Sequence, residues 1–226
     1  RHYQKTGKWP RLIAFQSRGE FIPNKALYNH HLQHGVMVFG WNSIPTRIYR
    51  KRGPRILDEV TRTSMNELHV NSAVEHDIPT AFPLSTNDKR NAEIILGKYG
   101  LLPYSYLCFQ ARDVKYKFVH SDKYGKGYLN SRKFEHARNT SVETIYVTAE
   151  KLAAMGIKTV RIGAHPDSAV SSQYVIDYSN QRHDDGFGDM ALMHFCKFFI
   201  GPNSGIWLFA RAFNRPICLI NVFPWP

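Results

Sequence analysis

The sequence has little of what holds small secreted proteins together or carries proteins across membranes. It contains only three cysteines in 226 residues, too few for a disulfide scaffold. No apolar run reaches the ~20 residues that a membrane span requires. The basic N-terminal segment has no apolar core of the kind found in signal peptides. We therefore expect a cytoplasmic protein, and because the first residue is Arg rather than Met, we take the chain to be a fragment.

Several sequence motifs of nucleotide-binding and catalytic sites are missing. The chain has no Gly-x-Gly-x-x-Gly fingerprint, no Walker loop and no Gly-x-Ser-x-Gly elbow, which argues against the enzyme classes that depend on them. It also has no Asp-x-Asp motif. His30 and His34 share a helical face, with His31 beside them, but no third ligand is evident. We predict neither a bound metal nor a cofactor, and we expect Cys108, Cys196 and Cys218, all in apolar segments, to be buried thiols.

Acidic residues are scarce, and the charge is uneven. The chain has 30 Lys and Arg against 18 Asp and Glu, a formal net charge of +12. Residues 1–62 hold 12 basic and 3 acidic residues, so 12 − 3 = +9 of that charge lies there. Such a patch suits an anionic membrane, a nucleic acid or a phosphorylated substrate, and a solvated face of no specific function is an equal alternative. We predict peripheral contact with the inner face of the plasma membrane, without nucleic acid, through a basic cluster: Arg47, Arg50, Lys51, Arg52 and Arg55.

What the sequence does contain is an alternation of strand and helix patterns. The N-terminal part predicts a strand, a helix over 24–34 and a second strand, with a further helix over 58–74 and a linker over 76–87. The rest predicts strands over 104–109, 159–162, 174–178, 196–200 and 216–220, with helices over 88–99, from 140 to 156, over 189–194 and over 206–213. This pattern predicts an α/β fold with parallel sheets, helices on both faces, and two domains, 1–86 and 87–226.

Polar residues lie at the carboxyl end of each predicted strand of the second domain. The groups are Gln110 to Asp113, Arg161 to Gly163, Asp177 with Tyr178, Gly201 to Gly205, and Asn221. Because ligands of parallel α/β sheets bind at the carboxyl ends of the strands, we expect these five groups to form one site.

Two predicted helix starts add features of an anion site. Thr140 and Glu143 have the spacing of a capping box, and Arg138 with Asn139 precedes it. Asn203 or Ser204 can cap the last helix, where Gly205 allows close approach to the backbone. Helix N-termini bind anions through unpaired N–H groups and the helix dipole. An ordinary capped turn is the alternative, as is an Arg112–Asp113 pair that only orders its loop.

The order of these motifs resembles a bacterial family of glycosyltransferases associated with surface polysaccharide synthesis. The resemblance covers roughly residues 88–221 and rests on Tyr106-Leu-Cys-Phe-Gln-Ala-Arg-Asp113, Arg138-Asn139, Val160-Arg-Ile-Gly163, Ile176-Asp-Tyr178, Cys196 to Gly205 and Arg215 to Asn221. It implies the GT-B architecture, with two Rossmann-like domains and a nucleotide sugar held by the second. More distantly, the chain is similar to GDP-fucose fucosyltransferases. Residues 1–86 are short for a complete acceptor-side domain.

The resemblance also implies roles for the candidate residues. A GDP- or UDP-linked sugar would pass to a glycan or a lipid-linked acceptor. Arg112, Arg138 and the Ser204-Gly205 turn would stabilise the departing diphosphate without a metal, and Asp113 is the candidate for the base that an inverting reaction needs. The remaining donor-binding candidates are Gln110, Asn139, Arg161, Gly163, Asp177, Tyr178 and Asn203.

Two other functions remain open from the sequence. The chain could be a non-enzymatic module for polyanions or nucleic acids, based on its basic N-terminal quarter and on aromatic residues such as Trp9 and Tyr49. Alternatively, it could be a GT-B-like transferase of a non-sugar group such as pyruvyl or phosphoryl.

Overall fold

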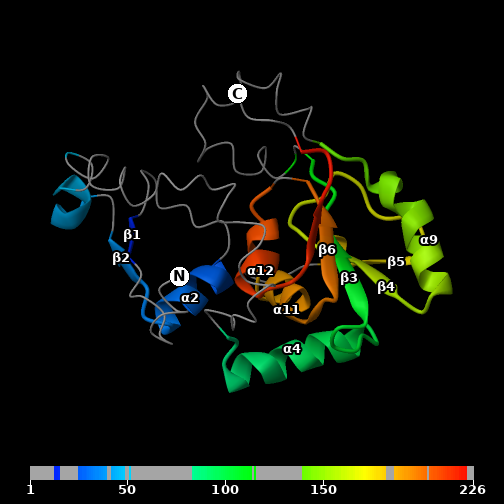
Figure 1. Cartoon of the computed structure of the whole chain (residues 1–226), viewed down its shortest axis with the longest axis horizontal. Coiled ribbons are helices and arrows are strands. Elements are labelled where there is room, and N and C mark those ends of the chain that lie inside the picture. Colours follow the sequence, from blue (N-terminus) through cyan, green and yellow to red (C-terminus); the bar gives the residue numbers. More distant parts are fainter. Residues whose placement is uncertain are drawn as a thin grey trace. The chain divides into compact units, whose positions relative to one another are not determined.

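The computed structural model in Figure 1 describes residues 13–15, 25–39, 42–48, 51, 83–113, 115, 139–181, 186–202 and 204–222. The chain divides into two compact units, Arg1–Phe82 and Pro83–Pro226. This division lies slightly before the boundary expected between residues 86 and 87. The reason is local, because the first helix of the second unit has its N-cap at Ser85 and a boundary at 86 would cut that helix.

The first unit contains a small parallel sheet. Strand β1 (Ile13–Phe15) pairs with β2 (Met37–Phe39), and α2 (Lys25–Gln33) connects them. Residues 44–48 are helical as well. Gly35 follows α2 with a φ of +77°, which suits a glycine. The helix expected over 58–74 lies outside the described residues.

The second unit is built around a five-stranded sheet. Its strands and helices are, in chain order, α4 (Thr86–Lys98), β3 (Tyr106–Phe109), the 3-10 helix η1 (Val142–Ile145), α9 (Tyr146–Ala154), β4 (Lys158–Arg161), β5 (Val175–Asp177), α10 (Tyr178–Gln181), α11 (Phe187–Phe195), β6 (Phe198–Gly201), α12 (Trp207–Ala212) and β7 (Ile217–Leu219). The strand order is β5-β4-β3-β6-β7, and every neighbouring pair is parallel. The second unit is therefore a Rossmann-like α/β fold.

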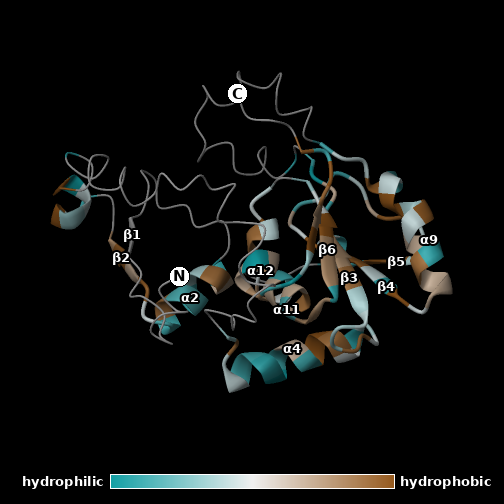
Figure 2. Cartoon of the chain, in the orientation of Figure 1, coloured by the Kyte–Doolittle hydropathy of each residue, from teal (hydrophilic) through white to brown (hydrophobic). Residues whose placement is uncertain are grey.

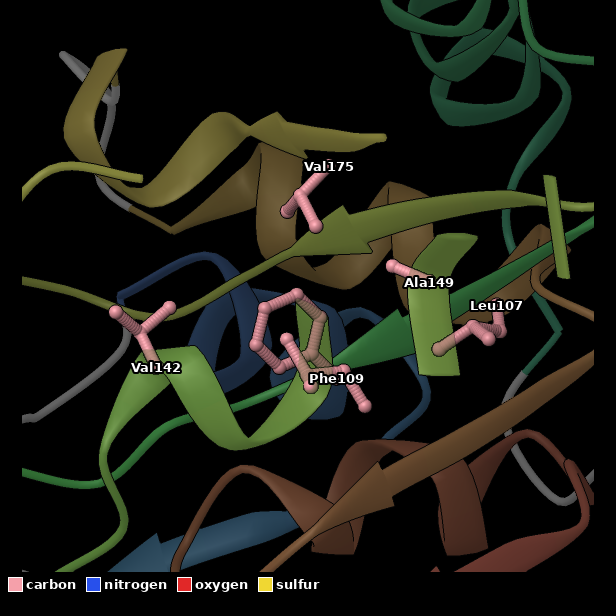
Figure 3. Packing of buried hydrophobic residues seen from close by; sticks show 6 residues of the cluster. Leu107, Phe109, Val142, Ala149 and Val175 are labelled. Carbon is pink, nitrogen blue, oxygen red and sulfur yellow. The ribbon is translucent and has the colours of Figure 1, made fainter. Parts of the chain in front are cut away.

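Helices cover both faces of this sheet. Leu107 and Phe109 of β3 pack on η1 and α9 through Val142, Ile145 and Ala149, and Figure 3 shows this cluster with Val175 of β5. The alternate side chains of β3, Tyr106 and Cys108, face the other way. There the Tyr106 hydroxyl donates to the carbonyl oxygen of Leu192 in α11 at 2.7 Å, and α4 packs on α11 in turn. The alternation along one strand thus separates two apolar layers.

Three local predictions are wrong. Ser141, not Thr140, is the N-cap of η1, and its hydroxyl accepts from the backbone N–H of Glu143. The final helix has Ile206 as its N-cap without a side-chain hydrogen bond, so Ser204 does not cap it. Cys108 and Cys196 are buried as expected, but Cys218 is exposed because it lies on the edge strand β7.

None of the helices in the described segments combines the length and the apolar character that crossing a membrane requires.

Candidate functional site

The strand order defines a switch point between β3 and β6. From β3 the chain moves outward to β4 through α9, whereas from β6 it moves the opposite way to β7 through α12. In open parallel sheets, ligands bind in the crevice at the carboxyl ends of the two strands where this direction reverses. Gln110 follows β3 at this edge, and Gly201 ends β6. Both belong to the polar groups singled out by the sequence.

Gln110 connects the two sides of the switch point. Its backbone N–H donates to the carbonyl oxygen of Ile200 at 3.1 Å and extends the β3–β6 pairing by one residue. Its side-chain Oε1 accepts from the hydroxyl of Ser204, in the turn after β6. Its Nε2 lies next to Gly163, 3.6 Å from the position that a Cβ would take there. Gln110 therefore brings together three of the residues predicted for donor binding.

A buried carboxylate binds the backbone of Gly163. Gly163 has a φ of +120°, a conformation that a side chain would strain, and its N–H donates to Oδ1 of Asp189 at 3.0 Å. Asp189 lies in the first turn of α11 and is only 2% exposed. Sequence reasoning missed its contribution to the site. The sequence feature that could have indicated this role is Asp189 itself, an acidic residue in a mostly apolar helix.

Two glycines at this edge have different surroundings, with close packing at the end of β6 and open space after it. A Cβ on Gly201 would come within 2.6 Å of Cζ of Phe199 and 3.4 Å of the carbonyl oxygen of Gln110. At Gly205 nothing lies within 4 Å of such a Cβ, and the residue is exposed. A ligand could therefore approach the backbone at Gly205 closely, whereas Gly201 is filled by the protein itself.

Arg112 adds a cation at the same edge. One guanidinium nitrogen donates to Oδ1 of Asn139 at 3.4 Å, and the backbone N–H of Thr140 donates to the carbonyl oxygen of Arg112 at 2.9 Å. Asn221, after β7, donates through Nδ2 to the Thr140 hydroxyl at 2.9 Å. These contacts connect the loops that follow β3 and β7. Arg138, the second predicted cation, and Asn203 lie outside the described residues.

Asp113 fastens two loops to each other. Its oxygens accept from the backbone N–H groups of Lys115 at 3.1 Å and Asp167 at 3.0 Å. Burial raises the pKa of Asp113 above its ordinary value, and the nearby Asp167 adds to this. The two backbone hydrogen bonds and Arg161 act in the opposite direction. The Nζ of Lys115 donates to the carbonyl oxygen of Pro166 at 3.1 Å. The loop after β4 is thus attached to the loop after β3.

Arg161 and Asp177 form an ion pair inside the unit. Their charged atoms are 3.7 Å apart, and their side chains are 3% and 12% exposed. Arg161 also donates to the carbonyl oxygen of Ser168 at 2.6 Å, and Asp177 accepts from the backbone N–H of Val170 at 2.9 Å. These predicted donor-binding residues therefore organise the loop between β4 and β5.

Tyr178 is buried at the start of α10. Its ring contacts that of Tyr99, after α4, edge-on at 5.9 Å between centroids. This packing accounts for its burial within the unit.

Two residues at the carboxyl edge have positive φ, the predicted Asn221 and His165, which was not predicted. His165, in the loop after β4, has a φ of +54°, and Asn221, after β7, has a φ of +50°. Such conformations are uncommon outside glycine. The side chain of His165 is exposed.

The histidines of α2 interact among themselves. Nδ1 of His34 donates to the carbonyl oxygen of His30 at 2.9 Å, and their rings lie 4.5 Å apart. Burial lowers the pKa of His31, and the neighbouring His30 and His34 lower it further. Within the described ranges, no three His, Cys, Asp or Glu side chains are arranged to hold a metal ion.

Comparison of the chain with protein-family models, with curated proteins and with solved structures finds no match.

Proposed function

We propose that the unit Pro83–Pro226 binds a nucleotide sugar at the switch point between β3 and β6, and that the protein is a GT-B-type glycosyltransferase of surface polysaccharide synthesis. The observation that carries this proposal is the meeting of Gln110, Ser204 and Gly163 at the carboxyl ends of three neighbouring parallel strands, β3, β6 and β4. Nucleotides bind to Rossmann-like sheets at this position. The family resemblance over residues 88–221 supplies the sugar and the transfer reaction.

The polar groups at this edge suit a diphosphate. Ser204 and Gln110 offer a hydroxyl and an amide, and the open space at Gly205 leaves room for a phosphate beside the backbone. Arg112 lies half-buried at the same edge. A guanidinium stabilises the negative charge that develops on a departing diphosphate, which is the role that a metal ion has in other transferases.

Asp113 fits a positioning role in this scheme better than the role of general base. Both of its carboxylate oxygens accept backbone N–H groups, from Lys115 and Asp167. A base must have an oxygen within reach of the acceptor hydroxyl. We therefore assign to Asp113 the attachment of the β4–β5 loop beside the donor.

A thermal-shift screen of the chain against GDP, UDP, ADP, CMP and dTDP tests this proposal. A nucleotide at a hundred times its dissociation constant should add about 2.7 kcal/mol to the free energy of unfolding. The shift should persist in EDTA. A shift that needs Mn²⁺ would disprove the metal-free scheme, and the lack of a shift with every nucleotide would disprove nucleotide binding and favour the polyanion-binding alternative.

Variants locate the bound nucleotide. Arg112→Ala should weaken binding most, by about tenfold or more, because hydrogen bonds to charged groups contribute about 1.5–3 kcal/mol. Gly205→Val should weaken it as well, since the added side chain would fill the open space. Arg90→Ala, an exposed arginine of α4, is the matched control for Arg112→Ala. If Arg112→Ala and Gly205→Val bind as the original chain does, the nucleotide lies elsewhere.

A further inference from the structure

The edge of the sheet opposite the candidate site has a surface of its own. The segments that precede β3, β4, β6 and β7 meet there. Nζ of Lys158 donates to the carbonyl oxygen of Gly100 at 2.6 Å, the N–H of Tyr104 donates to the carbonyl oxygen of Phe195 at 2.7 Å, and the guanidinium of Arg215 lies 5.0 Å from the Tyr104 ring. We call this the amino-edge surface and define it by six residues: Lys98, Leu102, Tyr104, Met155, Lys197 and Arg215.

Large apolar side chains project from the amino-edge surface. Leu102 is 70% exposed, Met155 72% and Tyr104 50%. Leu102 and Tyr104 lie in the turn between α4 and β3, at the right-hand end of α4 in Figure 1, and Met155 follows α9. Figure 2 shows that α4 itself is hydrophilic in its N-terminal half and more hydrophobic toward this turn. Packing within the unit leaves these side chains largely uncovered.

The same segments carry positive charge and no negative charge. Residues 97–105, 154–158, 195–198 and 213–217 contain Lys98, Lys158, Lys197 and Arg215 but neither Asp nor Glu. Two of these cations also serve the fold. Nζ of Lys158 donates to the carbonyl oxygen of Gly100, which follows α4. Nε of Arg215 donates to the carbonyl oxygen of Phe213, which follows α12, at 2.9 Å. Lysines at helix C-terminal ends are favourable in any case, but this does not account for the exposed apolar side chains beside them.

Exposed apolar side chains interspersed with lysines match the chemistry of an anionic bilayer. Apolar side chains enter the boundary between headgroups and acyl chains, while cations are attracted by anionic headgroups. A nucleic acid would use the cations but would gain nothing from Leu102 and Met155. We propose that the amino-edge surface docks the Pro83–Pro226 unit onto an anionic lipid bilayer.

This docking leaves the candidate site accessible. The amino and carboxyl ends of parallel strands lie at opposite edges of one sheet, so Leu102 and Gln110 belong to opposite edges of this unit. A unit docked through its amino edge therefore presents its switch point away from the lipid. The amino-edge surface belongs to the second unit, whereas the basic segment of Arg47 and Lys51 belongs to the first.

Co-sedimentation of the full chain with vesicles tests the docking. Vesicles of phosphatidylcholine mixed with phosphatidylserine in equal parts should bind the chain, vesicles of phosphatidylcholine alone should bind it much less, and added salt should weaken binding. Leu102→Ala should lower the affinity about tenfold, since burying each methylene is favourable. Lys98→Gln with Lys197→Gln should lower it by about fivefold for each cation removed.

Matched controls are available elsewhere in the second unit. Val147 is 63% exposed in the first turn of α9, at the opposite end of that helix from Met155, so Val147→Ala removes an exposed aliphatic side chain away from the amino edge. Lys89→Gln with Arg90→Gln removes the same charge from exposed positions of the first half of α4. These controls should bind as the original chain does, and all variants should keep its thermal midpoint and its nucleotide response.

Three outcomes would overturn the proposal. In the first, the chain binds vesicles with and without phosphatidylserine equally well. In the second, the amino-edge variants and their controls lose the same affinity. In the third, the amino-edge variants bind as the original chain does. Loss of binding only on Arg47→Gln with Lys51→Gln would move the membrane contact to the first unit. Salt-dependent binding of a DNA duplex that Leu102→Ala leaves unaltered would show a polyanion surface instead. Since the nucleotide response is measured separately, a failure here does not affect the proposed function.

Discussion

Asp113 combines a half-buried carboxyl group with two backbone hydrogen bonds, and the balance between them sets its response to pH. Its pKa is raised from 3.8, chiefly because burial disfavours the charged form. The folded protein therefore holds this proton more tightly than the unfolded chain does. It follows that the contribution of Asp113 to the free energy of unfolding is fully present below pH 3.8 and declines as the pH rises through the raised pKa.

The comparison of the original chain with Asp113→Asn isolates this effect. The free energy of unfolding of the original chain, minus that of Asp113→Asn, should fall as the pH rises from below 3.8 and should become constant above the raised pKa. Urea unfolding of both proteins at a series of pH values measures it. A difference that grows in favour of the original chain with rising pH would mean that the two N–H groups of Lys115 and Asp167 outweigh burial.

At the scale of single residues, the sequence predicts the role of a side chain correctly where neighbours along the chain determine that role. The prediction is wrong where tertiary contacts determine it. Serine and threonine are both favoured N-cap residues, with serine somewhat preferred, and the Thr140 hydroxyl accepts from Asn221, 81 residues away. Arg161 and Asp177 were predicted to bind the donor because each lies at the carboxyl end of a strand and belongs to a motif of the family resemblance. Their pairing depends on β4 and β5 being neighbours, which local sequence does not reveal. The support that Asp189 gives to Gly163 is a tertiary contact of the same kind.

At the level of elements, the start of α4 is the best-capped helix end described above. The Ser85 hydroxyl accepts from the backbone N–H of Asp88 at 3.1 Å and donates to its carboxylate at 2.7 Å. Ser85→Ala should lower the free energy of unfolding by about 1 kcal/mol. Ser141→Ala should cost less, because its hydrogen bond from Glu143 is longer, at 3.4 Å. Chemical denaturation of both variants measures the order, and a larger loss at Ser141 would contradict it.

The predicted elements agree with the structure where apolar runs and glycines mark them clearly. All five strands of the second unit occur within two or so residues of their predicted ranges, and α4 and α9 end before Gly100 and Gly156. The strand order could not be predicted in the same way. No helix separates β4 from β5, so the alternation of strand and helix fails there, and only the three-dimensional structure places β3 at the centre of the sheet.

At the level of the whole molecule, the second unit contains nearly all of the described core. Among the buried hydrophobic side chains of the described segments, only Ala26 belongs to the first unit. A fragment of residues 83–226 should therefore unfold in one cooperative transition, with a denaturant midpoint close to that of the full chain, and should keep any nucleotide binding. Circular dichroism during urea titration measures this. A fragment that unfolds without a cooperative transition would show that residues 1–82 complete the core.

The switch point between β3 and β6 also joins the most distant parts of this sheet along the chain. Leu107 pairs with Phe198, a separation of 198 − 107 = 91 residues, whereas the β4–β5 pair of Thr159 and Val175 spans 175 − 159 = 16. Distant pairings have the highest entropic cost of chain closure and slow folding. Gln110 and Ser204 consequently come together only after the chain between them has folded. Under the proposed function, a nascent chain emerging from the ribosome would have no nucleotide site until β6 has been synthesised, and only chains whose sheet is nearly complete would bind the donor.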